Sequence, residues 1–252
     1  MDYMDNDLGV LPGKAQKQIL VVPIIDGSGS MREHGNIGKV NEAMKEVAPQ
    51  LVEIEQENNV EILLAPILFN NGARWVGLPN NEPVRAGQFV WNNVEAAGGT
   101  DLGSAYRLLR EKLTRRENGG WLEGRKGLRP ILLLISDGAP NLGWEPSFDE
   151  LSKRGWFKVS MRYAIAVEGA VHDVLEKFTG TNETIYDTET LRTDLGSLIQ
   201  AIVIATSQAV SDGGGMIVDT TAATANVEDT AKEGIISAVN DTLTNNDESE
   251  FF

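Results

Sequence analysis

Near the N-terminus stands the apolar run Ile19-Leu20-Val21-Val22-Pro23-Ile24-Ile25, and the polar loop Asp26-Gly27-Ser28-Gly29-Ser30 follows it directly. A continuous apolar run that stops at a glycine-rich loop is typical of a strand buried on both faces of a parallel sheet. A second such run, Pro130-Ile131-Leu132-Leu133-Leu134-Ile135, stops at Ser136-Asp137-Gly138. These runs predict two central strands whose carboxyl ends both lead into polar loops.

Helical and strand patterns alternate along the rest of the chain. Apolar spacing predicts helices over 40–54, 102–113, 148–157, 171–178 and 191–207. Strand patterns cover 60–69, 162–167 and 184–186, and 74–78 pairs with 60–69 as a hairpin. The alternation predicts a three-layer α/β/α fold, a doubly wound and mainly parallel sheet with one antiparallel edge strand.

The composition bounds the class of protein and its partners. The chain has 252 residues, of which 41% are hydrophobic and 23% charged, enough for one sizeable core. The net charge of −15 predicts that neither nucleic acid nor a membrane surface is a partner, because both are anionic. The absence of cysteine excludes disulfides and thiolate zinc sites, and with an N-terminus unlike a secretory signal it favours the cytoplasm.

Composition also divides the chain into three parts. We expect a flexible acidic N-terminus over 1–16, one domain over 17–210 and an acidic, flexible tail over 211–252. Within the tail, apolar residues recur every four positions, which indicates an amphipathic helix over 226–243. They are Val227, Ala231, Ile235, Val239 and Leu243. This helix either docks on the domain or a partner, or forms transiently in solvent.

A third polar loop, Gly98-Gly99-Thr100-Asp101, directly precedes the helix predicted over 102–113. In open parallel sheets the functional crevice lies beyond the carboxyl ends of the strands, so the three loops are expected to meet there. They offer hydroxyl and carboxylate oxygens, which hard divalent cations prefer. The candidate metal ligands are Asp26, Ser28, Ser30, Thr100 and Asp137.

This combination of Asp26-x-Ser28-x-Ser30, Thr100 and Asp137 resembles the metal-ion-dependent adhesion site (MIDAS) of von Willebrand factor A (vWA) domains, over roughly residues 17–210. The resemblance implies that Ser28 and Ser30 bind the ion through their hydroxyls. Asp26 would hydrogen-bond a coordinated water or a serine, Thr100 would bind in one conformation, and Asp137 would bind directly or through water.

The expected ion is Mg²⁺, with Mn²⁺ as a possible replacement, because both accept the same oxygen ligands. Mg²⁺ takes about six oxygens and keeps several waters, so one position is left for an acidic side chain of a protein partner. The bound ion and the partner's carboxylate then each strengthen the binding of the other. By resemblance, the helix over 191–207 is the element that moves when the site is completed.

Within the family, the chain most resembles bacterial vWA proteins associated with tellurium resistance. The resemblance implies a non-enzymatic interaction module in a bacterial stress-response or regulatory complex, with a kinase or phosphatase of the same system as a possible partner. Two alternatives remain open, an Asp-dependent Mg²⁺ phosphotransfer enzyme and a metal-free vWA scaffold. The intact set of five ligand residues argues against the metal-free scaffold.

Other enzyme classes fit the residues less well. A dinucleotide-binding G-x-G-x-x-G would need glycine at position 32, which is Arg32, and no G-x-S-x-G surrounds Ser28 or Ser136. For the phosphotransfer alternative, Ser28 stands where a second aspartate is expected. Asp101 is interpreted as an acid that favours the start of the following helix, and not as a metal ligand.

Overall fold

The structure is a computed structural model. It describes residues 17–122, 127–137, 140–141, 143–167, 170–191, 193–212 and 221–249, and the side chains of the last helix only over 227–241. The predicted acidic N-terminus over 1–16 lies outside the described residues, as does Gly138 of the third predicted loop. The predicted domain boundaries and the flexibility of the termini stay predictions.

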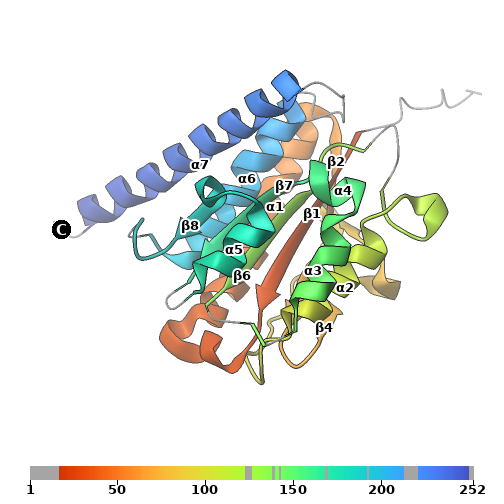
Figure 1. The fold of residues 1–252 in the computed structure, drawn as a ribbon. Helices are drawn as coiled ribbons and strands as arrows, with labels where there is room; N and C mark the ends of the chain where they lie inside the picture. The colour runs from red at the N-terminus through yellow and green to blue at the C-terminus, as the bar shows by residue number, and fades with distance from the viewer. Residues whose placement is uncertain are drawn as a thin grey trace, which may run out of the picture.

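The apolar runs form a single mixed sheet at the centre of the molecule (Figure 1). Its strands are β1 (Lys17–Asp26), β2 (Val60–Leu64), β3 (Ile67–Phe69), β4 (Ala73–Trp75), β5 (Val84–Arg85), β6 (Ile131–Ser136), β7 (Met161–Ala166) and β8 (Ile185–Asp187). The main path is β4-β3-β1-β6-β7-β8, and β2 pairs with β1 and β5. All pairs are parallel except β3 with β4 and β2 with β5.

The predicted strand over 60–69 is two strands, β2 and β3, which lie end to end along the same side of β1. Residues 17–21 of β1 pair with β2 and residues 24–26 pair with β3. Pro23 falls in the gap between the two pairings, where its missing N–H leaves no ladder bond unmade on that side. Ala65-Pro66 breaks the neighbouring strand at the same level.

Helices cover both faces of the sheet, so the predicted three-layer architecture is confirmed (Figure 1). The helices are α1 (Asn36–Asn58), α2 (Leu102–Lys112), α3 (Glu145–Ser152), α4 (Gly155–Val159), α5 (His172–Thr179), α6 (Leu195–Asp212) and α7 (Thr221–Ser249). Side chains of β1 alternate between two cores: Val21 packs with α1, α6 and α7, whereas Val22 packs with α2, α3, α4 and α5.

Two further local predictions needed correction. The helix predicted over 148–157 is two helices, α3 and α4, because the chain leaves helical geometry at Arg154. The predicted antiparallel edge strand is β4, but the two-residue β5 is a second antiparallel strand. β5 was missed because two residues carry no periodicity.

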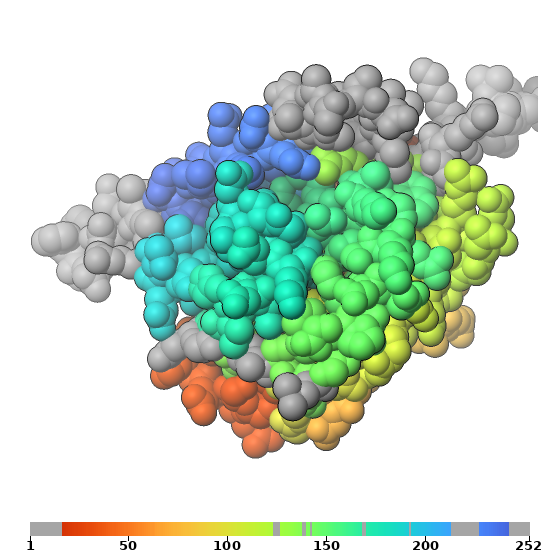
Figure 2. All heavy atoms as spheres, viewed as in Figure 1, coloured from red at the N-terminus to blue at the C-terminus, as the bar shows by residue number. Residues whose placement is uncertain are grey.

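The tail contains a helix, and α7 is longer than the range 226–243 predicted for it. Val227, Ala231, Ile235 and Val239 are buried and join the core shared by α1 and α6. Figure 2 shows α7 in blue beside the residues of α5 and β8, and the ion pair Lys232–Glu183 joins α7 at 2.6 Å to the turn between α5 and β8. Among the described residues, no helix is both long and apolar enough to cross a membrane.

Candidate metal centre

The site forms where β1 and β6 end side by side. The two strands are parallel, and Ile25 pairs with Ile135, so Asp26 and Ser136 leave the sheet at the same edge. The chain then turns to α1 on one face after β1 and to α3 on the other face after β6. This divergence opens the crevice in which α/β sheets bind ligands.

Asp26 anchors the site from inside the protein. Its side chain is fully buried, and both of its oxygens accept hydrogen bonds. Oδ1 accepts from the backbone N–H of Ser28 at 2.8 Å, and Oδ2 accepts from the hydroxyl of Ser136 at 2.8 Å. The carboxylate therefore fixes the first polar loop and ties it to the end of β6.

A chain of hydroxyls runs from this anchor toward the surface. The Ser28 and Ser30 hydroxyls lie 2.9 Å apart, and the Ser30 hydroxyl donates to Oδ1 of Asp137 at 2.9 Å. Ser28 and Asp137 are buried, whereas Ser30 is exposed. Four of the five predicted ligands are thus brought together by direct hydrogen bonds, and Ser30 is the member of the chain that faces solvent.

Backbone hydrogen bonds join the loop that contains Thr100 to the loops that follow β1 and β6. The Gly29 N–H donates to the Gly98 carbonyl at 3.0 Å, and the Asn141 N–H donates to the Thr100 carbonyl at 2.8 Å. Thr100 is half-buried. Within the described part of the chain, no hydrogen bond joins the Thr100 hydroxyl to the other four side chains, so Thr100 is adjacent to the cluster without being locked into it.

Asp101 begins α2, as predicted. Its Oδ1 accepts from the backbone N–H of Ser104 at 2.9 Å, which is the hydrogen bond of a helix N-cap. The Asp101 carboxylate thus accepts a hydrogen bond from a backbone N–H in the first turn of α2. The geometry therefore gives Asp101 a structural role, and Thr100 stays the candidate ligand of this loop.

The charges of the cluster favour a cation. Burial raises the pKa of Asp26, and its hydrogen bonds to Ser28 and Ser136 offset this in part. Burial also raises the pKa of Asp137, and the negative charge of Glu33 adds to the rise. Among the described residues, no basic side chain contributes to either pKa. Two partly desolvated carboxylates beside three hydroxyls are a donor set that fits Mg²⁺.

Two neighbouring asparagines support the loops, and the sequence reasoning did not find them. The Gly99 N–H donates to Oδ1 of Asn71 at 2.7 Å, and the Asp101 N–H donates to the Asn70 carbonyl at 2.6 Å. A Cβ on Gly98, which has a φ of +83°, would lie 2.6 Å from the Asn71 amide. In the sequence, Asn70-Asn71 indicates only the turn of the hairpin predicted between 60–69 and 74–78, and no local pattern signals its contact with a loop about thirty residues later.

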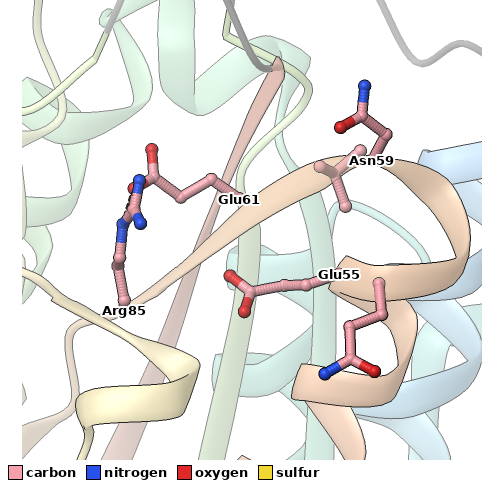
Figure 3. Close-up of a pocket in the computed structure, with 6 residues that line it drawn as sticks. Glu55, Asn59, Glu61 and Arg85 are labelled. Carbon is pink, nitrogen blue, oxygen red and sulfur yellow. Dashed lines mark hydrogen bonds and ion pairs between the residues drawn. The ribbon is translucent and has the colours of Figure 1, made fainter.

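An acidic pocket of about 260 Å³, separate from the metal centre, lies beside β2 and β5 (Figure 3). There Glu61 pairs with Arg85, and Glu55 accepts a hydrogen bond of 2.6 Å from the Ile62 N–H. The guanidinium already supplies the positive charge that these carboxylates need. In the described ranges no cluster of three or more His, Cys, Asp or Glu side chains could hold a metal, so the mixed hydroxyl and carboxylate site remains the candidate.

Fold and site together define a class: a doubly wound α/β domain with a hydroxyl and carboxylate cluster at the carboxyl edge of its sheet. The model of the von Willebrand factor type A domain matches residues 21–201, and the chain belongs to this family. A comparison with curated proteins found no match.

Solved structures share the fold at low sequence identity. Proximal thread matrix protein 1 from the mussel byssus, with a zinc-occupied MIDAS motif, is 17% identical over 78% of this chain and 48% of its own, with a TM-score of 0.54. A von Willebrand factor type A protein from Catenulispora acidiphila is 13% identical over 78% and 43%, with a TM-score of 0.53. The open form of the pilus adhesin SpaC from Lactobacillus rhamnosus GG is 14% identical over 80% and 31%, with a TM-score of 0.55. This chain spans about half or less of each of these proteins.

Proposed function

We propose that this vWA domain is a metal-dependent protein-binding module that captures an acidic side chain of a partner. The observation that carries the proposal is the continuous hydrogen-bonded chain from Asp26 through Ser28 and Ser30 to Asp137, which reaches the surface at Ser30. Among the described residues, no basic side chain contributes to the pKa of either carboxylate. A divalent cation would supply the positive charge that these hydroxyl and carboxylate oxygens need.

The residues would share the work of holding the ion. Ser28, Ser30 and Thr100 would offer hydroxyl oxygens, Asp137 a carboxylate, and Asp26 would hold the loop and a coordinated water. When bound, Mg²⁺ would supply a Lewis-acidic position for a carboxylate. Mn²⁺ would serve in the same way. Zinc in the MIDAS motif of the mussel protein supports a divalent ion in such a set of ligands.

A carboxylate is the partner group that this site fits best. Two ligand carboxylates neutralise a divalent ion, so the entering acid would meet no net repulsion at the ion itself. The chain as a whole carries −15, which disfavours acidic partners that lack a place on the metal. The metal would therefore decide which acidic side chain binds, and chelation would remove the partner.

The proposed setting is the bacterial cytoplasm, in a stress-response or regulatory complex like those of the tellurium-resistance group. A kinase or phosphatase of the same system is the proposed source of the acidic residue. The absence of cysteine is consistent with a reducing compartment. This assignment rests on resemblance and is separable from the metal site.

We propose no catalytic role for the domain. For an aspartyl-phosphate enzyme, Asp26 would have to attack phosphorus with one of its oxygens. Its side chain is fully buried, and each oxygen accepts a hydrogen bond from Ser28 or Ser136, so neither is presented to a substrate. A metal-free scaffold is the remaining alternative.

The test is capture of partners from bacterial lysate by the full chain in Mg²⁺ and in EDTA. The variants are Ser28→Ala, which removes a ligand, and Glu55→Gln, which removes another carboxylate whose pKa is raised by burial but which lies outside the site. Partners retained by wild type and Glu55→Gln only in Mg²⁺, and lost by Ser28→Ala, are expected. Capture that is the same in all conditions would contradict the proposal and favour the scaffold.

A further inference from the structure

A basic pocket of about 200 Å³ lies at the opposite end of the parallel strands from the metal centre. It forms at the amino ends of β6 and β7, whereas the metal loops follow the carboxyl end of β6, about 20 Å away along a strand of six residues. Its charged and hydroxyl lining consists chiefly of Arg129, Lys158, Arg162, Thr181, Thr184 and Glu228.

Arg129 is the buried donor of this pocket, with 6% of its surface exposed. Its Nε donates to the Val159 carbonyl at 2.7 Å, and Nη2 donates to Oε1 of Glu228 at 2.6 Å. Glu228 comes from α7, and its side chain is 46% exposed. The more exposed member of this pair is therefore a carboxylate that already occupies the place of an anion on a buried guanidinium.

Arg162 lies beside Arg129 and is held equally firmly. Its Nη1 donates to the Phe157 carbonyl at 2.7 Å and its Nη2 to the Thr179 carbonyl at 3.0 Å, while the guanidinium lies 4.7 Å from the centre of the Phe157 ring. Burial lowers the pKa of Arg162; the charge of Glu228 opposes that change, and the charge of Arg129 adds to it. The two guanidiniums thus compete for one carboxylate.

Among its described lining residues, the pocket has three basic side chains and one acidic side chain. Arg129, Arg162 and the exposed Lys158 face the single carboxylate of Glu228 among its described lining residues. The Thr184 hydroxyl is buried there and has no hydrogen-bond partner in the described structure. A net-positive cavity in a chain of charge −15, with an unused hydroxyl, is arranged for an oxyanion.

We propose that this pocket binds a phosphate group, in competition with the Glu228 carboxylate of α7. The guanidiniums, the Lys158 ammonium and the Thr184 hydroxyl are the donors that a phosphate needs, and the cavity volume exceeds that of one phosphate. The group comes either from free phosphate or from a phosphorylated side chain. The proposal is independent of the metal site, because the pocket and the metal site lie at opposite ends of the parallel strands.

The test is calorimetric titration of the full chain with inorganic phosphate and, separately, with O-phosphoserine, at constant ionic strength. Removing the competitor in Glu228→Gln is expected to tighten phosphate binding about 3- to 10-fold. Glu183→Gln is the matched control, since it removes the acid of another ion pair of α7, Lys232–Glu183, and is expected to stay near wild type. Lys158→Gln, at an exposed position that does not endanger folding, is expected to weaken binding about threefold.

Binding of phosphate alone would assign the pocket to the free anion, and binding of both ligands would assign it to phosphorylated side chains as well. Either result, with the expected order of variants, supports the proposal. No saturable heat with either ligand would overturn it. Equal affinities for wild type and Glu228→Gln, or equal gains in Glu228→Gln and Glu183→Gln, would also overturn it, because the effect would then be general charge.

Discussion

Oδ2 of Asp26 accepts a hydrogen bond of 2.8 Å from the hydroxyl of Ser136, and this bond joins the ends of the neighbouring strands β1 and β6. The bond fixes the orientation of a fully buried carboxylate but brings no positive charge to it. Burial consequently raises the pKa of Asp26. The buried charge of Asp26 thus lowers the free energy of unfolding when no cation is bound, and a bound cation would remove this cost.

We expect Asp26→Asn to be at least as stable as wild type in EDTA at neutral pH. The amide oxygen keeps the hydrogen bond from Ser28, and the buried charge is removed, for a gain of about 1 kcal/mol or a few °C in Tm. Mg²⁺ is expected to raise the Tm of wild type but not of the variant. Thermal unfolding in both buffers measures this, and an equal Mg²⁺ response in the two proteins would refute it.

The same pair of proteins gives a pH prediction. Because the pKa of Asp26 is raised in the folded state, the folded protein binds this proton at a higher pH than the unfolded chain does. The stability of wild type relative to Asp26→Asn in EDTA therefore rises as pH falls through the raised pKa, and levels off below the ordinary pKa of aspartate. Denaturant unfolding across this range measures it, and a pH-independent difference would contradict it.

Ser30→Ala should separate metal binding from stability. Ser30 is exposed, so we expect the free energy of unfolding in EDTA to change by less than about 1 kcal/mol. Its hydroxyl bridges Ser28 and Asp137, so metal affinity should fall about 10-fold or more. Calorimetry and denaturant unfolding check the two parts, and unchanged affinity would remove Ser30 from the ligand set.

Asn71→Ala tests the support of the Thr100 loop. The Gly99 N–H would lose its acceptor, and we expect metal affinity to fall about 10-fold while the protein stays folded. Asn58→Ala is the control, because Asn58 makes a similar side-chain bond to a backbone carbonyl at the end of α1, away from the site. Equal effects of the two substitutions on affinity would show that Asn71 has no positioning role.

Adjacent isoleucines test the docking of α7. Ile235 is fully buried and Ile236 is 56% exposed. Ile235→Ala should cost about 2–5 kcal/mol if the helix folds with the domain, whereas Ile236→Ala should stay within about 0.5 kcal/mol. Denaturant unfolding of the full chain measures both, and near-equal small effects would mean that α7 does not contribute to the stability of the domain.

The sequence predicted the elements whose signal is local. The continuous apolar runs before Asp26 and Ser136 identified two neighbouring central strands, and the glycine-rich loops after them identified four residues that the structure joins by hydrogen bonds. The two strands are confirmed, because burial on both faces leaves a pattern in the residues themselves. The metal-ligand role of the four residues stays a prediction. The role of Asp101 at the start of α2 was also predicted from a local signal, an acid directly before a helical pattern.

What the sequence could not provide depends on contacts between distant residues. The bond from Ser136 to Asp26 and that from Gly99 to Asn71 join loops that meet only in the folded sheet. The break at Ala65-Pro66 lies beside Pro23 of the neighbouring strand, and only the folded sheet brings these residues together. Likewise the four-residue period in the tail predicted a helix, but only packing on α6 decides what its apolar face contacts.

The central claim is that Asp26, Ser28, Ser30, Thr100 and Asp137 hold one divalent ion. The most direct measurement is a titration of the full chain with Mn²⁺, followed by electron paramagnetic resonance and by competition with Mg²⁺. We predict one ion bound to wild type and to Glu55→Gln, displaced by Mg²⁺, and none bound at the same concentrations to Asp137→Asn or Ser28→Ala. Absence of binding to wild type, or equal binding to all four proteins, would contradict the account.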